Sequence, residues 1–424
     1  MIKDMILRQK YEKEKIVKGN YVERKERSTA KKWLESDLIK VITGPRRAGK
    51  SVFAFMLLKE SPFMYFNFDD ESIRLRNEFN TDELIKSLHE VYGQSKIVLF
   101  DEIQNLPQWE LFVNRLQRQG YNLIITGSNS KLLSKELSTA LTGRHIPIEI
   151  LPFNFREFLS AKHFDFKEEF LQIPQKKGEL LRLAEEYLLT GGFPEIVTKD
   201  LELKEYLRTL FDSIILKDVV QRYRVKYTSE ISDIGTFLVN NFASLLSFRK
   251  IQNALSLRSI TTTKKYINYL EESYIFFELS QFSTKAIERM KSPRKMYIVD
   301  NGYITAKSVR TSFDRGKLLE NLVFIELVKQ KKEPNSDFFY YKTRNGREVD
   351  FVIRENLHIS ELIQVSYDTS NIETTQREIK SLIEAREELN AQELEVITWD
   401  EEKEIEKNGK TITFKPILKW LLHS

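Results

Sequence analysis

One segment of eight residues constrains the fold of this 424-residue chain more than any other feature. It reads GPRRAGKS, fits the pattern GxxxxGK[ST], and lies between the apolar run 38–43 and the helical run 52–58. A strand, a glycine loop and a helix N-terminus in this order bring main-chain N–H groups and the helix dipole to phosphate oxygens. The sequence therefore predicts a nucleotide site made of Gly44, Pro45, Arg46, Arg47, Ala48, Gly49, Lys50, Ser51 and Val52.

Two side chains of this loop have distinct expected roles. Lys50 is expected to act catalytically by reaching the β- and γ-phosphates, and Ser51 to offer its hydroxyl to Mg²⁺. The flanking pattern supports this interpretation, because short apolar runs recur at 38–43, 63–68, 97–100, 123–126 and 146–151 with helical stretches between them. Such runs are typical of strands buried on both faces of a parallel sheet, so the predicted fold class is α/β, doubly wound.

An acidic pair follows the third apolar run, about 50 residues after the loop. Asp101 is predicted to hold Mg²⁺ through water, and Glu102 to position and polarise the water that attacks the γ-phosphate. Successive side chains of a strand point to opposite faces, so adjacent acids suit different tasks. Helix capping or a surface ion pair is the structural alternative.

Polar residues near the next two strands complete the predicted site. Ser128 or Asn129 is placed to sense the γ-phosphate, with capping of the following helix as the alternative. Arg144 is the candidate arginine finger, supplied by the same chain or by a neighbouring subunit, because a rigid guanidinium suits the charge on a transferring phosphoryl group. A surface ion pair is the alternative for Arg144, and Arg46 and Arg47 are further candidates for contact with phosphate or a partner domain.

The order of these segments resembles that in a prokaryotic family of AAA-like P-loop ATPases. The segments are GPRRAGKS, VLFDEIQNLPQWE, IITGSNSKLLS and LTGRHIPIEILPFNFREFL, and further landmarks are GGFPE (191–195), YLEESYIFF (269–277) and EVDFVI (348–353). The resemblance covers nearly the whole chain. It implies an α/β P-loop fold with strand order 5-1-4-3-2, ATP as the nucleotide, a winged helix, and a C-terminal domain resembling restriction endonucleases.

Five parts are predicted along the chain. They are an N-terminal helical arm (1–27), a P-loop ATPase domain (28–160), a helical lid (161–228), a winged helix-turn-helix domain (229–294) and a restriction-endonuclease-like domain (295–424). The arm is read as a contact for an oligomer or a nucleic acid, or as a solvated terminal helix. The winged-helix domain is read as a DNA contact through Arg249, Lys250, Arg258, Lys264 and Lys265, or as a brace between domains.

The C-terminal part carries an incomplete nuclease pattern. Glu320 lies on an amphipathic helix, Asp350 in a strand, and Gln364 in a later strand, which resembles a helix acid, a strand acid and E-x-K. In an active enzyme such acids hold Mg²⁺, which activates water. The E-x-K position lacks both its carboxylate and its lysine, and Glu361 is out of phase with it.

Two interpretations of this part stay open. The first is a disabled nuclease fold kept for binding. The second is a variant active site that uses Gln364 and Tyr367.

Composition bounds the remaining possibilities. Lys and Arg exceed Asp and Glu by 67 − 62 = 5, which permits nucleic-acid binding without requiring it. The chain has no cysteine, so a disulfide framework, a thiolate metal site and a cysteine nucleophile are excluded, and the count of only five histidines argues against a histidine-rich metal centre. No apolar run is long enough to span a bilayer, and we expect a cytoplasmic protein without a membrane partner.

Three uses of ATP hydrolysis are expected from these observations. They are action on DNA or RNA, a signalling or protein-remodelling switch with a protein partner or a homo-oligomer, and an ATP-regulated nuclease.

Overall fold

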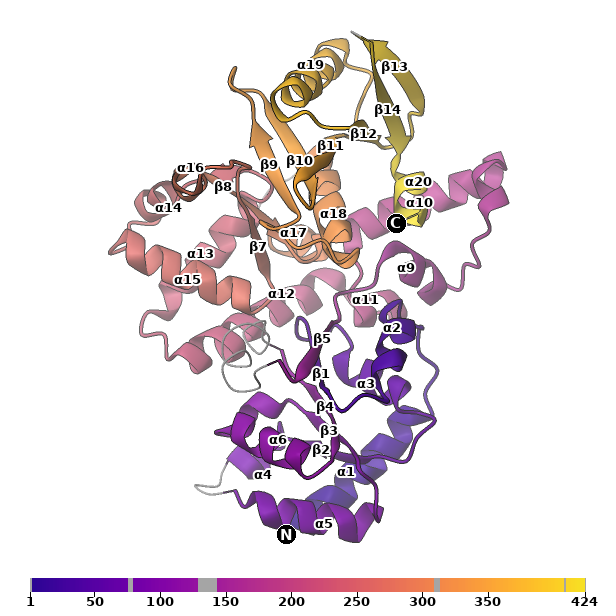
Figure 1. Cartoon of the computed structure of the whole chain (residues 1–424), viewed down its shortest axis with the longest axis vertical. Coiled ribbons are helices and arrows are strands. Elements are labelled where there is room, and N and C mark those ends of the chain that lie inside the picture. Colours follow the sequence, from indigo (N-terminus) through magenta and orange to yellow (C-terminus); the bar gives the residue numbers. More distant parts are fainter. Residues whose placement is uncertain (1, 75–78, 129–142, 309–312, 408, 424) are drawn as a thin grey trace. The chain divides into compact units, whose positions relative to one another are not determined.

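The computed structural model describes residues 2–74, 79–128, 143–308, 313–407 and 409–423 (Figure 1). The chain divides into two compact units, of which the first comprises Met1–Pro152 and Glu272–Tyr274, and the second Phe153–Glu271 and Ile275–Ser424. The first unit contains α1 (Ile2–Val17), α2 (Glu26–Trp33), β1 (Ile39–Thr43), α3 (Lys50–Leu57), β2 (Met64–Asn67), α4 (Glu71–Arg74), α5 (Thr81–Tyr92), β3 (Ile97–Asp101), η1 (Ile103–Asn105), α6 (Trp109–Arg118), β4 (Asn122–Thr126) and β5 (His145–Glu149).

A five-stranded sheet forms the centre of the first unit. Its strand order is β2-β3-β4-β1-β5, and every neighbouring pair is parallel. This confirms the predicted α/β fold and the order 5-1-4-3-2. All five residues of β1 are buried, as expected for a strand with helices on both faces. Because the strands are parallel, the loop after β1, the end of β3 and the end of β4 meet at one edge of the sheet.

Helix α1 packs into the core of this unit. Ile2, Met5 and Ile6 are buried in the same cluster as Ile39 and Val41 of β1. The expectation of a solvated terminal helix is therefore wrong, whereas a contact of its exposed face with an oligomer or a nucleic acid stays a prediction. Its apolar residues form a narrow stripe three and four positions apart, which the dense charges around it obscure in the sequence. Burial of each such side chain stabilises the fold by about 1.5–3 kcal/mol.

The second unit begins with helices and a small sheet. Its elements to residue 298 are α9 (Phe155–Ala161), η2 (Glu168–Leu171), α10 (Pro174–Thr190), α11 (Pro194–Thr198), α12 (Leu203–Ile214), the π-helix η3 (Ile215–Gln221), α13 (Thr228–Asn240), β6 (Leu245–Leu246), α14 (Phe248–Ala254), α15 (Ile260–Glu272), β7 (Phe276–Leu279), α16 (Ala286–Lys291) and β8 (Arg294–Ile298). Strands β6, β8 and β7 form an antiparallel sheet in that order. Strand β8 lies almost wholly in the part 295–424 that the sequence sets apart, but it pairs with strands that come before residue 295. The sequence could not show its partners because an apolar strand does not encode its neighbours.

A mixed sheet completes the second unit. Its order is β13-β14-β12-β11-β10-β9, with β12 parallel to both β11 and β14 and the other pairs antiparallel. The elements are α17 (Asn301–Lys307), α18 (Arg315–Lys329), β9 (Phe338–Lys342), β10 (Glu348–Glu355), β11 (His358–Ser366), α19 (Ile372–Leu389), β12 (Glu393–Thr398), β13 (Lys403–Lys407), β14 (Lys410–Pro416) and α20 (Ile417–His423). Within the described ranges, no helix is both long and apolar enough to cross a bilayer.

The GGFPE landmark is explained by packing within the second unit. Gly191 has φ +72°, and a Cβ at this position would lie 1.7 Å from Oδ1 of Asp300. The other carboxylate oxygen of Asp300 accepts a hydrogen bond of 2.7 Å from the Gly192 amide. Burial raises the pKa of Asp300 to about 6, although this amide and that of Gly302 donate to the carboxylate and oppose the shift. Gly191 therefore leaves the space that the buried acid fills, and the Gly192 amide binds the carboxylate.

Candidate nucleotide site

The loop after β1 has the geometry that a phosphate-binding loop requires. Gly44 has φ +137°, and a Cβ on it would lie 1.9 Å from the carbonyl oxygen of Ile150, so only glycine fits. Gly49 has φ +94° and begins α3 as its N-cap. Lys50 is 4% exposed, and its Nζ donates to the carbonyl oxygens of Gly44 (3.0 Å) and Pro45 (2.9 Å). The lysine ammonium thus lies inside the loop, where it can exchange carbonyl oxygens for phosphate oxygens.

Asp101 is held at the end of β3 by hydroxyl groups. The Ser51 Oγ donates to its Oδ1 at 3.0 Å, and the Thr126 hydroxyl donates to the same oxygen. The Tyr65 hydroxyl donates to Oδ2 at 3.4 Å. These contacts fix the direction of a buried carboxylate next to the first turn of α3. A serine hydroxyl and a carboxylate are oxygen ligands of the kind that Mg²⁺ takes.

Glu102 is turned away from the strand geometry of β3. Its backbone is left-handed (φ 50°, ψ 46°), its amide donates to the Thr126 hydroxyl at 3.1 Å, and its carboxylate accepts a hydrogen bond from the Gln104 side chain. Burial raises the pKa of Glu102, Lys50 opposes the shift, and Asp101 adds to it. A carboxylate with a raised pKa is a stronger base. A strained backbone at such a position is frequent at functional sites.

The remaining loop residues and Ser128 also lie at this edge. The Gly127 amide donates to the Ile42 carbonyl at 3.0 Å, so the chain beyond β4 runs beside the end of β1, and Ser128 is 1% exposed. Arg46 is partly buried and its charge lowers the pKa of Glu102. Val52 is partly buried in α3, Ala48 is buried, and Arg47 is exposed with φ 68°. The sensing role of Ser128 stays a prediction, and Asn129 lies outside the described residues.

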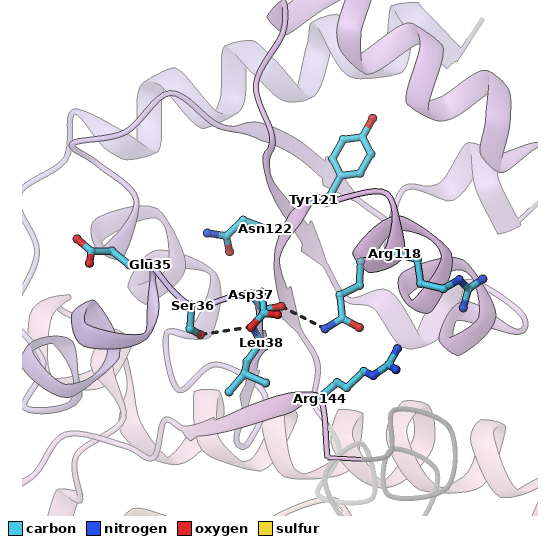
Figure 2. A pocket seen from close by; sticks show the side chains of 10 residues that line it. Glu35, Ser36, Asp37, Leu38, Arg118, Tyr121, Asn122 and Arg144 are labelled. Atoms are coloured by element: carbon cyan, nitrogen blue, oxygen red, sulfur yellow. Dashed lines mark hydrogen bonds between the residues drawn. The ribbon is translucent and has the colours of Figure 1, made fainter.

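Arg144 lies at the opposite edge of the sheet. Its carbonyl accepts from the Ile39 amide at 2.9 Å where β1 begins, and it lines a pocket of about 460 Å³ together with Asp37, Leu38 and Arg118 (Figure 2). Five residues of β1 separate this edge from the loop, which is about 16 Å at 3.3 Å per residue. Arg144 therefore cannot act on a phosphate bound at the loop of its own chain, and the same-chain alternative is wrong. Delivery by a neighbouring subunit stays a prediction.

Two residues that support the loop were missed by sequence reasoning. Arg24 is buried, and its guanidinium donates to the carbonyl oxygens of Ala48 (3.1 Å) and Leu151 (2.5 Å). The Tyr274 hydroxyl donates to the Thr43 hydroxyl at 3.0 Å, directly before the loop. Burial holds the pKa of Tyr274 well above its ordinary value, so its hydroxyl stays protonated. The YLEESYIFF landmark contains Tyr274, whereas Arg24 has no signal within a charge-dense segment.

The three residues of the nuclease-like pattern are brought together in the second unit. The Asp350 amide donates to Oε1 of Gln364 at 3.4 Å, and the carboxylates of Asp350 and Glu320 both contact Lys295. Lys295 was not predicted, because it comes from β8 and not from the E-x-K strand. Tyr367 instead accepts a hydrogen bond from Arg315 and donates to Glu185 at 3.5 Å.

Comparisons with known proteins place this geometry in a family. Residues 36–159 match the family described as AAA domain, and 181–313 and 315–419 match two families described as domains of unknown function (DUF8612 and DUF4143). The uncharacterized protein MJ1544 of Methanocaldococcus jannaschii is 38% identical over 400 residues, which cover 91% of this chain and 88% of that protein. An uncharacterized protein of Haemophilus influenzae is 32% identical over 360 residues, covering 80% and 86%.

A solved structure is also similar. The Walker-type ATPase PABY2304 of Pyrococcus abyssi superposes with a TM-score of 0.45 and 16% identity, over 69% of this chain and 99% of that chain. The relatives from the archaeon and the bacterium match over most of both chains, and the AAA domain match coincides with the loop and the sheet described above. The chain therefore belongs to a prokaryotic family of AAA-like P-loop ATPases.

Proposed function

We propose that the chain hydrolyses ATP at the loop 44–51 in a Mg²⁺-dependent reaction. The observation that carries the proposal is the 3.0 Å contact between the Ser51 hydroxyl and Asp101, because it joins the phosphate loop to the acid at the end of β3. Ser51 and Asp101 would hold Mg²⁺, Lys50 would neutralise the β- and γ-phosphates, and Glu102 would accept a proton from the attacking water.

The division of labour between the two acids follows from their surroundings. Asp101 accepts hydrogen bonds from Ser51, Thr126 and Tyr65, which hold its carboxylate in one direction and leave little room for rotation. Glu102 receives one side-chain hydrogen bond, from Gln104, and its pKa is raised by burial. A fixed anion suits a metal site, and a more basic carboxylate suits the handling of water.

Three variants test the proposal. Lys50→Ala should lose ATP binding, and Glu102→Gln should bind ATP and Mg²⁺ but release phosphate at least about a hundredfold more slowly, because the amide cannot accept the proton. Lys59→Ala removes an exposed lysine just after α3 and should change neither quantity. Binding is measured by calorimetry and turnover by phosphate release. Wild-type turnover in Glu102→Gln would exclude the proposed role of Glu102, and ATP binding by Lys50→Ala would exclude the site itself.

We further propose that hydrolysis drives or switches an interaction of the second unit with DNA. Support comes from exposed cations on α14 and α15: Arg249, Lys250, Lys264 and Lys265. The Lys264 ammonium lies 5.1 Å from the Phe248 ring centroid, so the two helices present their charges together. The winged-helix and nuclease-like assignments and the five-part division of the chain belong to this proposal.

The DNA proposal has a salt-dependent signature. ATPase activity should rise with double- or single-stranded DNA, and the stimulation should fall steeply between low and moderate salt because phosphate contacts release counterions. A variant in which both Lys264 and Lys265 are alanine should lose stimulation while keeping its basal rate. Activity unaffected by DNA at both salt concentrations, but raised by a protein partner or by self-association, would favour the signalling or protein-remodelling switch.

A further inference from the structure

A buried lysine of the second unit is surrounded by carboxylates from two other elements. Lys295 lies on β8 and is 2% exposed. Its Nζ lies 2.8 Å from Oε1 of Glu320 on α18, 2.6 Å from Oε1 of Glu348, and 3.0 Å from Oδ1 of Asp350 on β10. Oxygen atoms of three acids thus converge on one cationic nitrogen.

The local structure aims each acid at this point. Glu348 and Asp350 are two positions apart on β10, so both side chains lie on the same face of the sheet. The second oxygen of Asp350 accepts a hydrogen bond of 3.1 Å from the Val365 amide, which fixes the direction of the carboxylate. The Tyr297 hydroxyl, two positions after Lys295, donates to Oε1 of Glu320 at 2.7 Å.

The charges of the cluster depend on the lysine. Glu320 and Asp350 are 8% and 7% exposed, and an oxygen of each lies within 3.0 Å of the Lys295 ammonium. Buried carboxylates without a counter-cation are strongly destabilising. The cluster therefore needs a cation, and its chain supplies one.

We propose that the Lys295 ammonium occupies the position of a divalent cation among Glu320, Glu348 and Asp350. The acidic cluster is then closed by its own chain, and it takes an ion of the Mg²⁺ or Mn²⁺ type only when Lys295 is removed. Oxygen donors from three carboxylates are the ligands such ions prefer, and a small inward movement would shorten the present separations to metal–oxygen distances of about 2.1 Å. With the ammonium in place, no group of three or more His, Cys, Asp or Glu side chains in the described ranges could hold a metal ion, as expected if Lys295 closes the cluster.

This state of the nuclease-like part, with its acidic cluster closed by Lys295 and without a metal ion, does not depend on ATP hydrolysis. We expect no cleavage of nucleic acid for two reasons. The E-x-K acid and lysine are missing, and the Lys295 ammonium lies where the metal ion would bind. A working nuclease would instead need a metal ion and Lys295 side by side at the cluster.

The test removes the lysine and asks whether a metal ion replaces it. Nucleotide-free Lys295→Ala should unfold at a lower temperature than wild type in EDTA, and Mn²⁺ should raise its Tm in a saturable manner. Electron paramagnetic resonance should count one more bound Mn²⁺ per chain than in the double variant Lys295→Ala/Asp350→Asn, which accounts for any ion at the ATP loop. Lys295→Gly, which leaves more room for a hydrated ion, is measured alongside.

Lys329→Ala is the matched control. Lys329 is also a buried lysine of this unit, but its Nζ contacts a single carboxylate, that of Glu326 at 2.9 Å, along with the Phe153 carbonyl and the Tyr187 hydroxyl. Its removal should lower Tm without rescue by Mn²⁺, because one acid does not make a divalent-cation site.

Several results would overturn the proposal. One is a wild-type chain that binds a Mn²⁺ ion which Asp350→Asn removes. A second is DNA cleavage by the wild type with Mn²⁺ that Lys295→Ala abolishes, since metal and lysine would then work together. Lys295→Ala and Lys295→Gly chains that fold without extra Mn²⁺, or that refold in neither EDTA nor Mn²⁺, also contradict it, because the ion should replace the ammonium.

Discussion

Replacement of Glu361 by glutamine should stabilise the protein at alkaline pH. Glu361 on β11 is paired in register with Glu393 of β12, and burial together with Glu395 and Glu393 raises its pKa to about 8. Lys415, 3.1 Å from Glu395, offsets only part of this repulsion. The folded state therefore keeps a proton on Glu361 that the unfolded chain releases above its ordinary pKa of 4.5. The stability that this group contributes is complete below pH 4.5 and is lost as the pH rises to 8.

The size of the effect follows from the shift. The difference between 4.5 and about 8, at about 1.4 kcal/mol per pKa unit, gives an upper bound of about 5 kcal/mol. Because Glu361 is partly exposed, we expect about 2–4 kcal/mol at pH 9. Calorimetric unfolding of wild type and Glu361→Gln at pH 5, 7 and 9 should show a Tm difference that is small at pH 5 and grows with pH.

A control separates this effect from a general change in charge. Glu406→Gln removes an exposed acid from β13 and should shift Tm equally at all three pH values. The reasoning would be refuted if Glu361→Gln were less stable than wild type at pH 9, or if its Tm difference did not change with pH. The same variant bears on the nuclease-like pattern, because Glu361 lies against Glu395 while Gln364 lies against Asp350.

Three further predictions concern the loop, the landmark glycine and the distant arginine. An equimolar mixture of Arg144→Ala and Lys50→Ala chains should release phosphate faster than either variant alone, because only a neighbouring chain can deliver Arg144; equal rates would exclude delivery between chains. Arg24→Ala should raise the Kd for ATP about tenfold to a hundredfold, since a charged hydrogen bond contributes about 1.5–3 kcal/mol, and Arg24→Lys should restore little of it; calorimetry with ATP measures both. Gly191→Ala should lower stability by more than about 2 kcal/mol in thermal unfolding, because its Cβ would overlap Asp300, whereas Gly120→Ala, with a similar φ of +78° and no described atom within 4 Å, should lose about 1 kcal/mol.

The parts of the fold that the sequence predicts well are those specified locally. The GPRRAGKS segment contains both its glycines and its lysine, and the apolar runs predict β1 to β5 because strands buried on both faces are apolar throughout. Asp101 and Glu102 could be found because they end such a run. The position of Arg144 could also be predicted, because it directly precedes β5. In a parallel sheet, a residue before a strand lies at the end opposite to the loop that follows β1.

Residues whose role depends on a distant partner could not be found in this way. In the sequence Lys295 is a single cation near the start of a strand, and its partners lie 25 to 55 residues away on α18 and β10. Arg24 donates to carbonyl oxygens of the backbone. Every residue has such an oxygen, so the sequence does not show which ones Arg24 contacts. The buried stripe of α1 is short and interrupted by charge. In each case the role of the residue depends on which distant segment it contacts in the fold, and neither segment alone shows that contact.

Gly191 and Gly192 affect what can be concluded when this chain is compared with its relatives. Gly191 leaves room for the buried carboxylate of Asp300, and the Gly192 amide binds it. The two glycines therefore indicate one way of packing the end of α10 against the start of α17. A chain that shares them shares this piece of architecture. It need not share a binding partner, so inheritance of a biological role across relatives should be judged on the exposed cations of α14 and α15 and on the acids around Lys295.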